Sequence, residues 1–346
     1  MFKMNGVINF EYLISAALHE PSYFNRAVHG VRLLFDIYSD ELGFLFVEND
    51  IILKMQGYGY FPSKDIFQSV VSKMDEEPVF GADDIARMIN VFLSKAIHFD
   101  ETKNNCIVEW EKDAEALSEI CAISNERKKE VTNQLLEYAI QNNFSSIKSS
   151  VLYYNESSPL KITSATFNGE IKEAYPFQVN HQNKCFSSLV EVFSNIEDYL
   201  LKLDGYEIYK SATCSSKYKL AFFIGTLKLI RESNLERTIN WDDFKIGESF
   251  MASLVENESD KDRRYSSVTY EAVINFLAKS GKNDVNYFYR SDSIIEPRKI
   301  GHFTAYRVHI TKGGRALRLL AWKNEKNGSW IISNIGNKSE LQIANP

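Results

Sequence analysis

The sequence is poor in cysteine and has no long apolar run. Its 346 residues include four cysteines, with no CxxC pair and no histidine at zinc-ligand spacing: Cys106, Cys121, Cys185 and Cys214. Such sparse cysteines are typical of reduced thiols rather than of a disulfide framework, and they predict no metal site. The longest apolar runs, such as Leu220–Ile224, fall far short of the roughly 18 residues that span a bilayer. With no secretory signal visible, we expect a cytoplasmic protein that does not contact membranes.

Complete catalytic and cofactor-binding signatures are also lacking. Neither GxSxG nor HExxH occurs, and Gly57 and Gly59 lack the third glycine of a dinucleotide-binding loop. The segment GNKS, residues 336–339, lacks the upstream glycine and the following helix of a phosphate-binding loop. The spacing of Arg298 and His302 is one residue short of the Rx4–6H motif of HEPN ribonucleases. We therefore expect no small-molecule cofactor.

The overall composition is typical of a globular protein, with 44% apolar and 25% charged residues. A length of 346 predicts two or three domains. The net charge of −6 is distributed unevenly along the chain. Residues 297–346 contain nine Lys or Arg and two Glu, a charge of +7, which leaves −13 for the first 296 residues. An acidic body is thus joined to a basic C-terminal region.

We predict an α+β N-terminal region over residues 1–82. Helical spacing covers residues 10–18 and 27–35. Two β-rich runs, residues 43–47 and 51–55, are separated by three polar residues, which predicts a β-hairpin.

We predict a mostly helical middle domain over residues 83–235. Asp83 caps an apolar stripe that extends to Ile97, and two further helices are expected over residues 114–121 and 126–140. This pair also fits a helix-turn-helix, although the mixed charges of residues 126–130 favour a solvated face. Ser188 and Glu191 have capping-box spacing, which predicts a helix up to Leu203.

We predict a basic C-terminal module over residues 236–346. A helix around residues 268–277 ends at Gly281, and three strands follow, at residues 301–311, 315–323 and 329–336. The pair Asn327-Gly328 is typical of a type I′ hairpin turn. The predicted fold class is α+β and multidomain, with largely helical N-terminal and middle regions and a C-terminal helix plus antiparallel three-stranded meander.

The alternation of side chains along the strands places several basic residues of this module on one face of the sheet. Alternate side chains point to opposite faces, so pairing of the aliphatic rows of the first two strands leaves the arginines together. We expect one exposed face to carry Arg307, His309, Arg318 and Trp322. Basic side chains beside an aromatic ring suit phosphates and a stacked single-stranded base. A solvated sheet face that happens to be basic is the alternative.

The order of RVHI, a glycine turn, an arginine-bearing strand and a last strand closing in IGNKSE resembles the C-terminal half of RelE/ParE/HigB-type bacterial toxins. The resemblance covers residues 303–341 and implies a helical hairpin against an antiparallel sheet. It also implies metal-independent mRNA cleavage, free or on the ribosome. In this resemblance, Arg307 matches the arginine of the first strand of these toxins, and Arg318 or Arg315 matches the arginine of the second strand. Lys338 matches their closing basic residue. The terminal tyrosine of RelE is absent, and this chain is more than three times the usual length.

Metal-free RNA cleavage requires a base for the 2′-hydroxyl, cations for the phosphorane and an acid for the leaving oxygen. His309 suits the base or the acid because its ordinary pKa lies near neutrality, and Glu340 is a further base. The predicted catalytic residues are Arg307, His309, Arg318, Lys338 and Glu340. The predicted nucleic-acid-binding residues are Arg298, Lys299, Lys312, Arg315, Trp322 and Lys323.

These features predict an RNA-directed toxin or effector of a bacterial toxin–antitoxin or phage-defence system, restrained by its acidic N-terminal region. The expected partners are RNA or the ribosome, and an antitoxin or another protein. Two alternatives stay open. One is a non-catalytic adaptor or regulatory subunit of a defence complex that binds nucleic acid or protein, and the other is a structural subunit of a larger complex.

Overall fold

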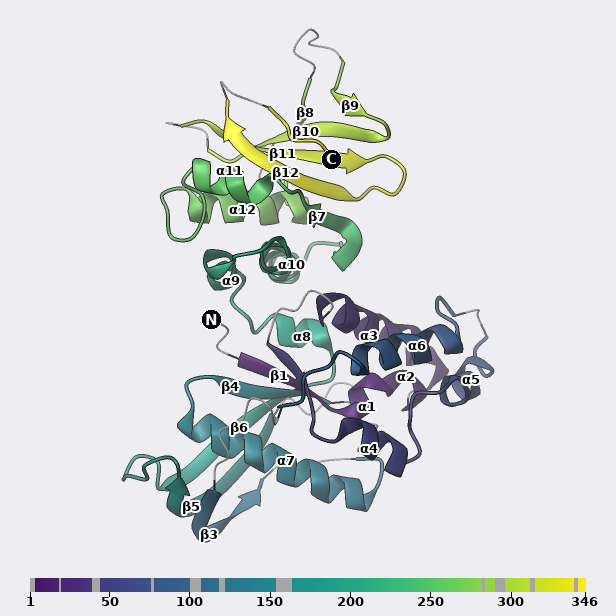
Figure 1. The fold of residues 1–346 in the computed structure, drawn as a ribbon, viewed down its shortest axis with the longest axis vertical. Coiled ribbons are helices and arrows are strands. Elements are labelled where there is room, and N and C mark those ends of the chain that lie inside the picture. The colour runs from purple at the N-terminus through teal and green to yellow at the C-terminus, as the bar shows by residue number, and fades with distance from the viewer. Residues whose placement is uncertain are drawn as a thin grey trace. The chain divides into compact units, whose positions relative to one another are not determined.

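The computed structural model describes residues 4–18, 20–38, 44–75, 78–99, 107–117, 122–153, 164–281, 284–289, 296–311, 315–338 and 342–346. The chain divides into two compact units, an N-terminal unit ending at Leu200 and a C-terminal unit beginning at Leu201. Each unit combines helices with one mixed sheet, so the fold class is α+β (Figure 1). The division lies between the expected boundaries at residues 83 and 236. It also separates charge, because residues 1–200 sum to −12 and residues 201–346 to +6.

The N-terminal unit is built on a six-stranded sheet in the order β2-β1-β4-β6-β5-β3. Strands β2, β1, β4 and β6 are parallel neighbours, and β5 and β3 continue the sheet in antiparallel fashion. The strands are β1 (Met4–Ile8), β2 (Leu45–Val47), β3 (Ile107–Ala116), β4 (Lys148–Leu152), β5 (Ser164–Tyr175) and β6 (Cys185–Phe193).

Eight helices accompany these strands in the described part of the unit, apart from a short 3₁₀ turn at Pro21–Tyr23. They are α1 (Phe10–Leu13), α2 (Ser15–Leu18), α3 (Phe24–Tyr38), α4 (Ile51–Gly57), α5 (Lys64–Val71), α6 (Ala82–Leu93), α7 (Asn125–Phe144) and α8 (Ile196–Leu200). The Ser124 side chain caps α7 by accepting from Arg127 N. Val131, Leu135 and Tyr138 of α7 then pack on the sheet to form the main core of the unit.

The β-hairpin predicted for residues 43–55 is wrong. Leu45–Val47 form β2 but pair in parallel with β1, and residues 51–55 lie in α4. Ile51 and Met55 are both buried, and their spacing of four residues is that of one helix face. Gly43, the first residue of the predicted hairpin, lies outside the described residues.

The middle region contains four strands, β3 to β6, so the mostly helical prediction for it is wrong. The capping-box helix at Ser188 is replaced by β6, which has sheet partners on both sides, β4 and β5. Phe186, Val190 and Val192 are buried at a spacing of two, which is the strand period. The first helix of the possible helix-turn-helix does not begin at residue 114, because β3 extends to Ala116; the last four residues expected in that helix, 118–121, lie outside the described residues.

The C-terminal unit packs helices against one face of a second sheet (Figure 1). Its strands run in the order β7-β12-β11-β10-β8, with β9 beside β10. They are β7 (Phe244–Ile246), β8 (Val285–Tyr287), β9 (Lys299–Ile300), β10 (Phe303–His309), β11 (Leu317–Asn324) and β12 (Trp330–Asn337). Strands β10, β11 and β12 are successive antiparallel neighbours, whereas β7 adds in parallel to β12. The sheet is thus larger than the three strands expected.

The helices of this unit are α9 (Gly205–Ser211), α10 (Ser215–Glu232), α11 (Phe250–Glu256) and α12 (Ser266–Ala278), with a 3₁₀ turn at Trp241–Asp243. Phe276 of α12 and Tyr306 of β10 both pack edge-on against Trp330 of β12, which fixes the helix-covered face of the sheet.

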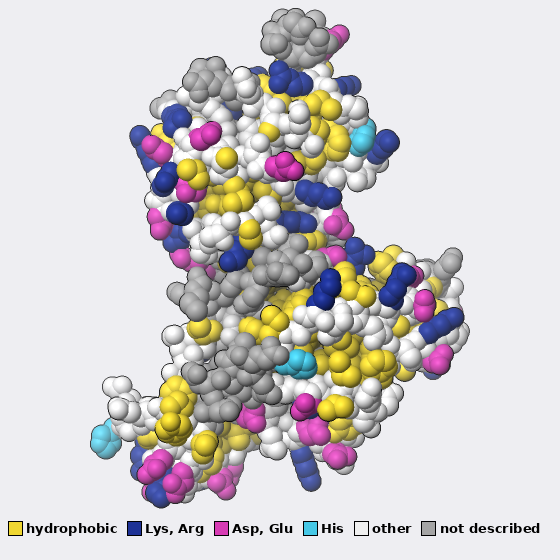
Figure 2. Space-filling model, viewed as in Figure 1, with side chains coloured by type: hydrophobic (Ala, Val, Ile, Leu, Met, Phe, Trp, Pro, Cys, Tyr) yellow, Lys and Arg dark blue, Asp and Glu magenta, His cyan; other side chains and the backbone are white. Residues whose placement is uncertain are grey.

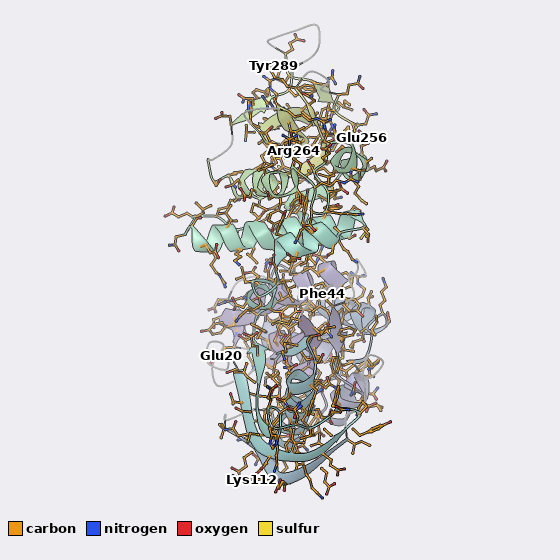
Figure 3. The ribbon with its side chains drawn as sticks, turned by 90° about the vertical axis from the view of Figure 1, so that its left-hand side faces the viewer. Glu20, Phe44, Lys112, Glu256, Arg264 and Tyr289 are labelled. Atoms are coloured by element: carbon orange, nitrogen blue, oxygen red, sulfur yellow. The ribbon has the colours of Figure 1, made fainter. Side chains whose placement is uncertain are left out.

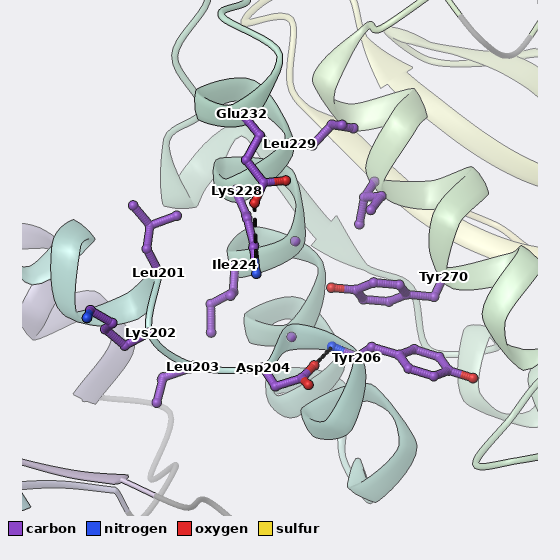
Figure 4. A pocket seen from close by; sticks show the side chains of 13 residues that line it. Leu201, Lys202, Leu203, Asp204, Tyr206, Ile224, Lys228, Leu229, Glu232 and Tyr270 are labelled. Atoms are coloured by element: carbon purple, nitrogen blue, oxygen red, sulfur yellow. Dashed lines mark hydrogen bonds and ion pairs between the residues drawn. The ribbon is translucent and has the colours of Figure 1, made fainter.

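Close helix packing on the other side of α12 depends on two glycines. Tyr270 of α12 reaches between α9 and α10, where its hydroxyl donates to Ala221 O at 3.3 Å. A Cβ at Gly205 or Gly225 would clash with this hydroxyl. Beside Tyr270 lies a cavity of about 440 Å³ within the C-terminal unit (Figure 4).

The described residues contain neither a membrane-spanning helix nor a cluster of metal-ligating side chains. None of their helices is both long and apolar enough to cross a membrane. They also contain no cluster of three or more His, Cys, Asp or Glu side chains that could hold a metal ion.

Candidate nucleic-acid interface

The register of β10 and β11 places the predicted basic residues on one face of the sheet. Val308 lies opposite Leu319, so the aliphatic rows share the helix-covered face, as the strand period predicted. On the other face, His309 lies opposite Arg318, and Arg307 lies opposite Leu320. The face is therefore shared as expected.

The expected exposure of this face is wrong for two of its four residues. Trp322 is fully buried and Arg318 is only 7% exposed. Residues 342–346 cross this face, and the Trp322 indole N–H donates to Ala344 O at 2.7 Å. Ile343 is buried against Trp322 and Leu320. Trp322 is therefore part of the core and offers no ring on which a base can stack in this structure.

The sequence contained a signal for this burial. Residues 317–322 read LRLLAW, a nearly continuous apolar run, which is typical of a central strand buried on both faces. A clean alternation would have indicated one solvated face. The partner of Trp322, however, comes from residues 343–344, which no local pattern connects to β11.

The other half of the face is polar and carries two arginines close together. Arg318 donates through Nη1 to Leu317 O at 3.0 Å and to Thr311 O at 3.3 Å. Burial lowers the pKa of Arg318 below its ordinary value, and the charge of Arg307 lowers it further. The Nε of Arg307 is buried and has no hydrogen-bond partner. Within the described part of the chain, no carboxylate pairs with either arginine.

Further predicted residues gather at the same end of the sheet. Lys338 N donates to Ala316 O at 3.0 Å, which brings Lys338 beside the start of β11, next to Arg315. Lys338 is exposed, whereas Arg315 is half-buried. We call this group the basic end of the sheet; it comprises Arg307, His309, Arg315, Arg318 and Lys338.

The remaining predicted residues do not join the basic end. The Arg298 guanidinium lies over the Phe288 ring at 5.1 Å, in the apolar half of the face. Lys299 of β9 lies opposite Thr304 of β10 in the antiparallel ladder. Lys323 forms an ion pair with Glu325 at 3.4 Å. The predicted residues Lys312 and Glu340 lie outside the described residues. In Figure 2 the visible Lys and Arg side chains of the C-terminal unit form several separate groups.

A buried ion network in the N-terminal unit was not predicted. Arg127 Nε donates to Glu11 at 2.6 Å, and its Nη2 donates to Glu11 and Glu48, each at 2.8 Å. Glu48 also accepts from Phe10 N at 2.8 Å and from Lys54 Nζ at 2.9 Å. The Arg127 guanidinium lies over the Phe10 ring at 4.5 Å.

This network lies where β1 and β2 end, because Glu11 and Glu48 follow those parallel strands closely. Such strand ends are frequent ligand sites in α/β sheets. Here the carboxylates are already paired with Arg127 and Lys54, so the network is suited to holding the strand ends together. A sequence signal existed, since Glu11 interrupts an apolar segment and Glu48 directly follows one.

The candidate interface is thus the basic end of the sheet, in which two arginines lie close together without a carboxylate partner among the described residues. Comparison of the chain with family models, curated proteins and solved structures found no match.

Proposed function

We propose that the chain is an RNA-directed toxin or effector whose C-terminal unit binds RNA phosphates at the basic end of the sheet and cleaves the strand without a metal ion. The resemblance of residues 303–341 to RelE/ParE/HigB-type toxins supports this proposal, as does the packing of α12 against β10. The proposal includes a C-terminal module, residues 236–346, that carries the activity within a multidomain chain.

The position of Arg307 and Arg318 on one face of neighbouring strands is the observation that carries the proposal. Two like charges held together on a partly desolvated surface repel each other, and here no described carboxylate offsets that cost. An RNA phosphate would supply the missing negative charge beside the half-buried Arg307 side chain. The wider charge of the unit, +6, would steer an anionic strand toward it.

The proposed chemistry uses the residues around this pair. His309 takes the proton of the 2′-hydroxyl, the 2′-oxygen attacks the adjacent phosphorus, and the bond to the 5′-oxygen breaks. The products are a 2′,3′-cyclic phosphate and a 5′-hydroxyl that receives a proton from an acid. Arg307 and Arg318 stabilise the pentavalent phosphorane, with Lys338 as a further cation and Glu340 as a second acid or base.

Growth arrest and RNA cleavage test this proposal directly. Expression of the full chain should arrest bacterial growth, and purified chain should fragment single-stranded RNA in the presence of EDTA. Arg307→Ala and His309→Ala should each abolish both effects while circular dichroism stays unchanged. Lys326→Ala, which removes an exposed cation of the same unit outside the basic end, is the matched control and should retain both. Undiminished toxicity of the Arg307 and His309 variants would refute the assignment.

We further propose that the acidic N-terminal unit restrains the basic one through its charge of −12. Replacing the exposed acids Asp65, Asp83 and Glu173 by their amides should then strengthen RNA binding several-fold at low salt. The charge-preserving change of Asp65 and Asp83 to Glu is the control. Equal affinity of the amide variant and the native chain would contradict this restraint.

A second candidate function is favoured by the burial of Trp322. Because Trp322 is buried, the face has cations but no exposed Trp322 ring on which a base could stack. This arrangement fits a non-catalytic adaptor that binds nucleic acid or an acidic protein. RNA binding that depends on Arg307, with no fragmentation at any salt concentration, would support this function over cleavage.

A further inference from the structure

A polar groove of about 530 Å³ lies between α11 and the edge of the C-terminal sheet. Among the described residues, β7 pairs with residues 330–332 of β12, and no other strand lies beside the second half of β12 on this side. The residues that line the groove include Ser253, Glu256, Asn257, Arg315, Gly336 and Asn337.

Two side chains, one from α11 and one from the Asn257 C-cap that follows it, form hydrogen bonds with the open edge of β12 at the floor of the groove. Ile335 N donates to Ser253 Oγ at 2.9 Å, and Asn257 Nδ2 donates to Ile335 O at 3.4 Å and to Ser253 O at 2.9 Å. Ser253 and Asn257 are both buried, so the floor is fixed in place. The groove is therefore a built feature with a rigid polar base rather than a gap between loose loops.

The walls of the groove carry opposite charges that do not pair with each other. Glu256, the last residue of α11, is exposed on one side, and Arg315, which precedes β11, is half-buried on the other (Figure 3 for Glu256). No ion pair joins them, and neither pairs with another described residue. A ligand that offers donors to a carboxylate and acceptors to a guanidinium would satisfy both.

The groove adjoins the basic end of the sheet. Gly336 lines the groove and lies opposite Arg318 in the β11–β12 ladder, one strand spacing of about 4.8 Å away. Arg315 belongs to both features. A nucleotide whose phosphate lies on Arg318 would therefore have its base within reach of the groove.

We propose that the groove binds one guanine base of the RNA strand, a specificity that rests on the proposed function above. Guanine presents the N1–H and N2–H₂ donors on one edge and the O6 and N7 acceptors on another. The two donors match the Glu256 carboxylate, and the two acceptors match the Arg315 guanidinium. Arginine is the side chain that most often binds O6 and N7 of guanine. Adenine, cytosine and uracil each lack two adjacent donors on the edge that would face Glu256.

Fluorescence anisotropy with two labelled RNA probes tests the assignment on the full chain. One probe is a decamer of 2′-O-methyluridine, which lacks the 2′-hydroxyl that the proposed cleavage uses, and the other is the same decamer with a single central 2′-O-methylguanosine. The guanosine should tighten binding about tenfold, because one bidentate contact discriminates between bases by such a factor. Glu256→Gln should abolish this preference and leave binding of the uridine decamer unchanged relative to the control variant. Glu271→Gln, which removes an exposed carboxylate of α12 outside the groove, is that control.

The outcomes separate this inference from the function on which it rests. If both probes bind with a normal salt dependence but equally well, the guanine groove is overturned and phosphate binding stands. A preference for adenosine in a third probe would overturn the guanine assignment in the same way. If neither probe binds at low salt, the proposed function fails and the groove assignment fails with it.

Discussion

Arg127 of the N-terminal unit and Arg318 of the C-terminal unit are both removed from water, yet their surroundings differ completely. Arg127 is fully buried and hydrogen-bonds to two buried carboxylates, whereas Arg318 is 7% exposed and donates only to backbone carbonyls. Burial tends to lower the pKa of Arg127, but the hydrogen bonds and charges of Glu11 and Glu48 outweigh it and raise that pKa. The pKa of Arg318 is lowered instead.

The contrast shows how a buried cation can be classified from its partners. The chain itself supplies every countercharge around Arg127, so that site is complete and its role is to hold β1, β2 and α7 together. Around Arg318 the charge that affects its pKa is that of another arginine, and no described carboxylate pairs with it. Removing one partner of a buried ion pair is costly, because the other charge stays buried without a partner. A buried cation without a partner lowers the stability of the folded protein before any substitution is made.

The largest effect is expected from Arg127→Met. This change leaves Glu11 and Glu48 buried without their main partner, and removing one side of a buried pair typically costs 3–5 kcal/mol. We expect the free energy of opening of the N-terminal unit to fall by about 4 kcal/mol. Amide hydrogen exchange with peptide resolution measures each unit separately, which matters because a two-unit chain need not unfold in one step.

The matched control for this variant is Arg87→Met on α6. The Arg87 side chain is 72% exposed and pairs with Asp84 on the same helix, so its loss should have no measurable effect on exchange. If Arg127→Met changed the opening free energy as little as Arg87→Met, the ion network would be dispensable for stability. The contrast between Arg127 and Arg318 would then no longer hold.

The elements that could be predicted from the sequence are those with a strong local period. The apolar stripes predicted α6, α7 and α12, and the matching of the aliphatic rows of residues 306–310 and 317–321 predicted the register of β10 and β11. In the three helices and in β10, a one-residue shift would expose a whole apolar row, so few alternatives compete. The shared face of Arg307, His309 and Arg318 follows from this register.

The failures occurred where a distant partner decides the conformation. Residues 186–193 became a strand because β4 and β5 flank them, although Ser188 and Glu191 have capping-box spacing. The burial of Trp322 depends on Ala344, 22 residues away, and the Arg127 network joins residues separated by 116 and 79 positions. Local propensity carries no information about such contacts. The same limit hid the groove, because its walls come from α11, β12 and the segment before β11.

A smaller effect on stability, but the sharpest test of the comparison, is expected from Arg318→Met. Because Arg318 has no carboxylate to leave unpaired, its replacement by an apolar side chain of similar length should change the opening free energy of the C-terminal unit by less than about 1 kcal/mol. RNA affinity, by contrast, should fall about tenfold, and the slope of affinity against salt should decrease by about one counterion. Lys326→Met, which removes an exposed cation outside the basic end, should leave both quantities nearly unchanged. Destabilisation by several kcal/mol, of the kind expected for Arg127→Met, would instead make Arg318 a structural residue. A cation that binds an external anion has no partner within the chain, so its removal should not leave a buried charge unpaired.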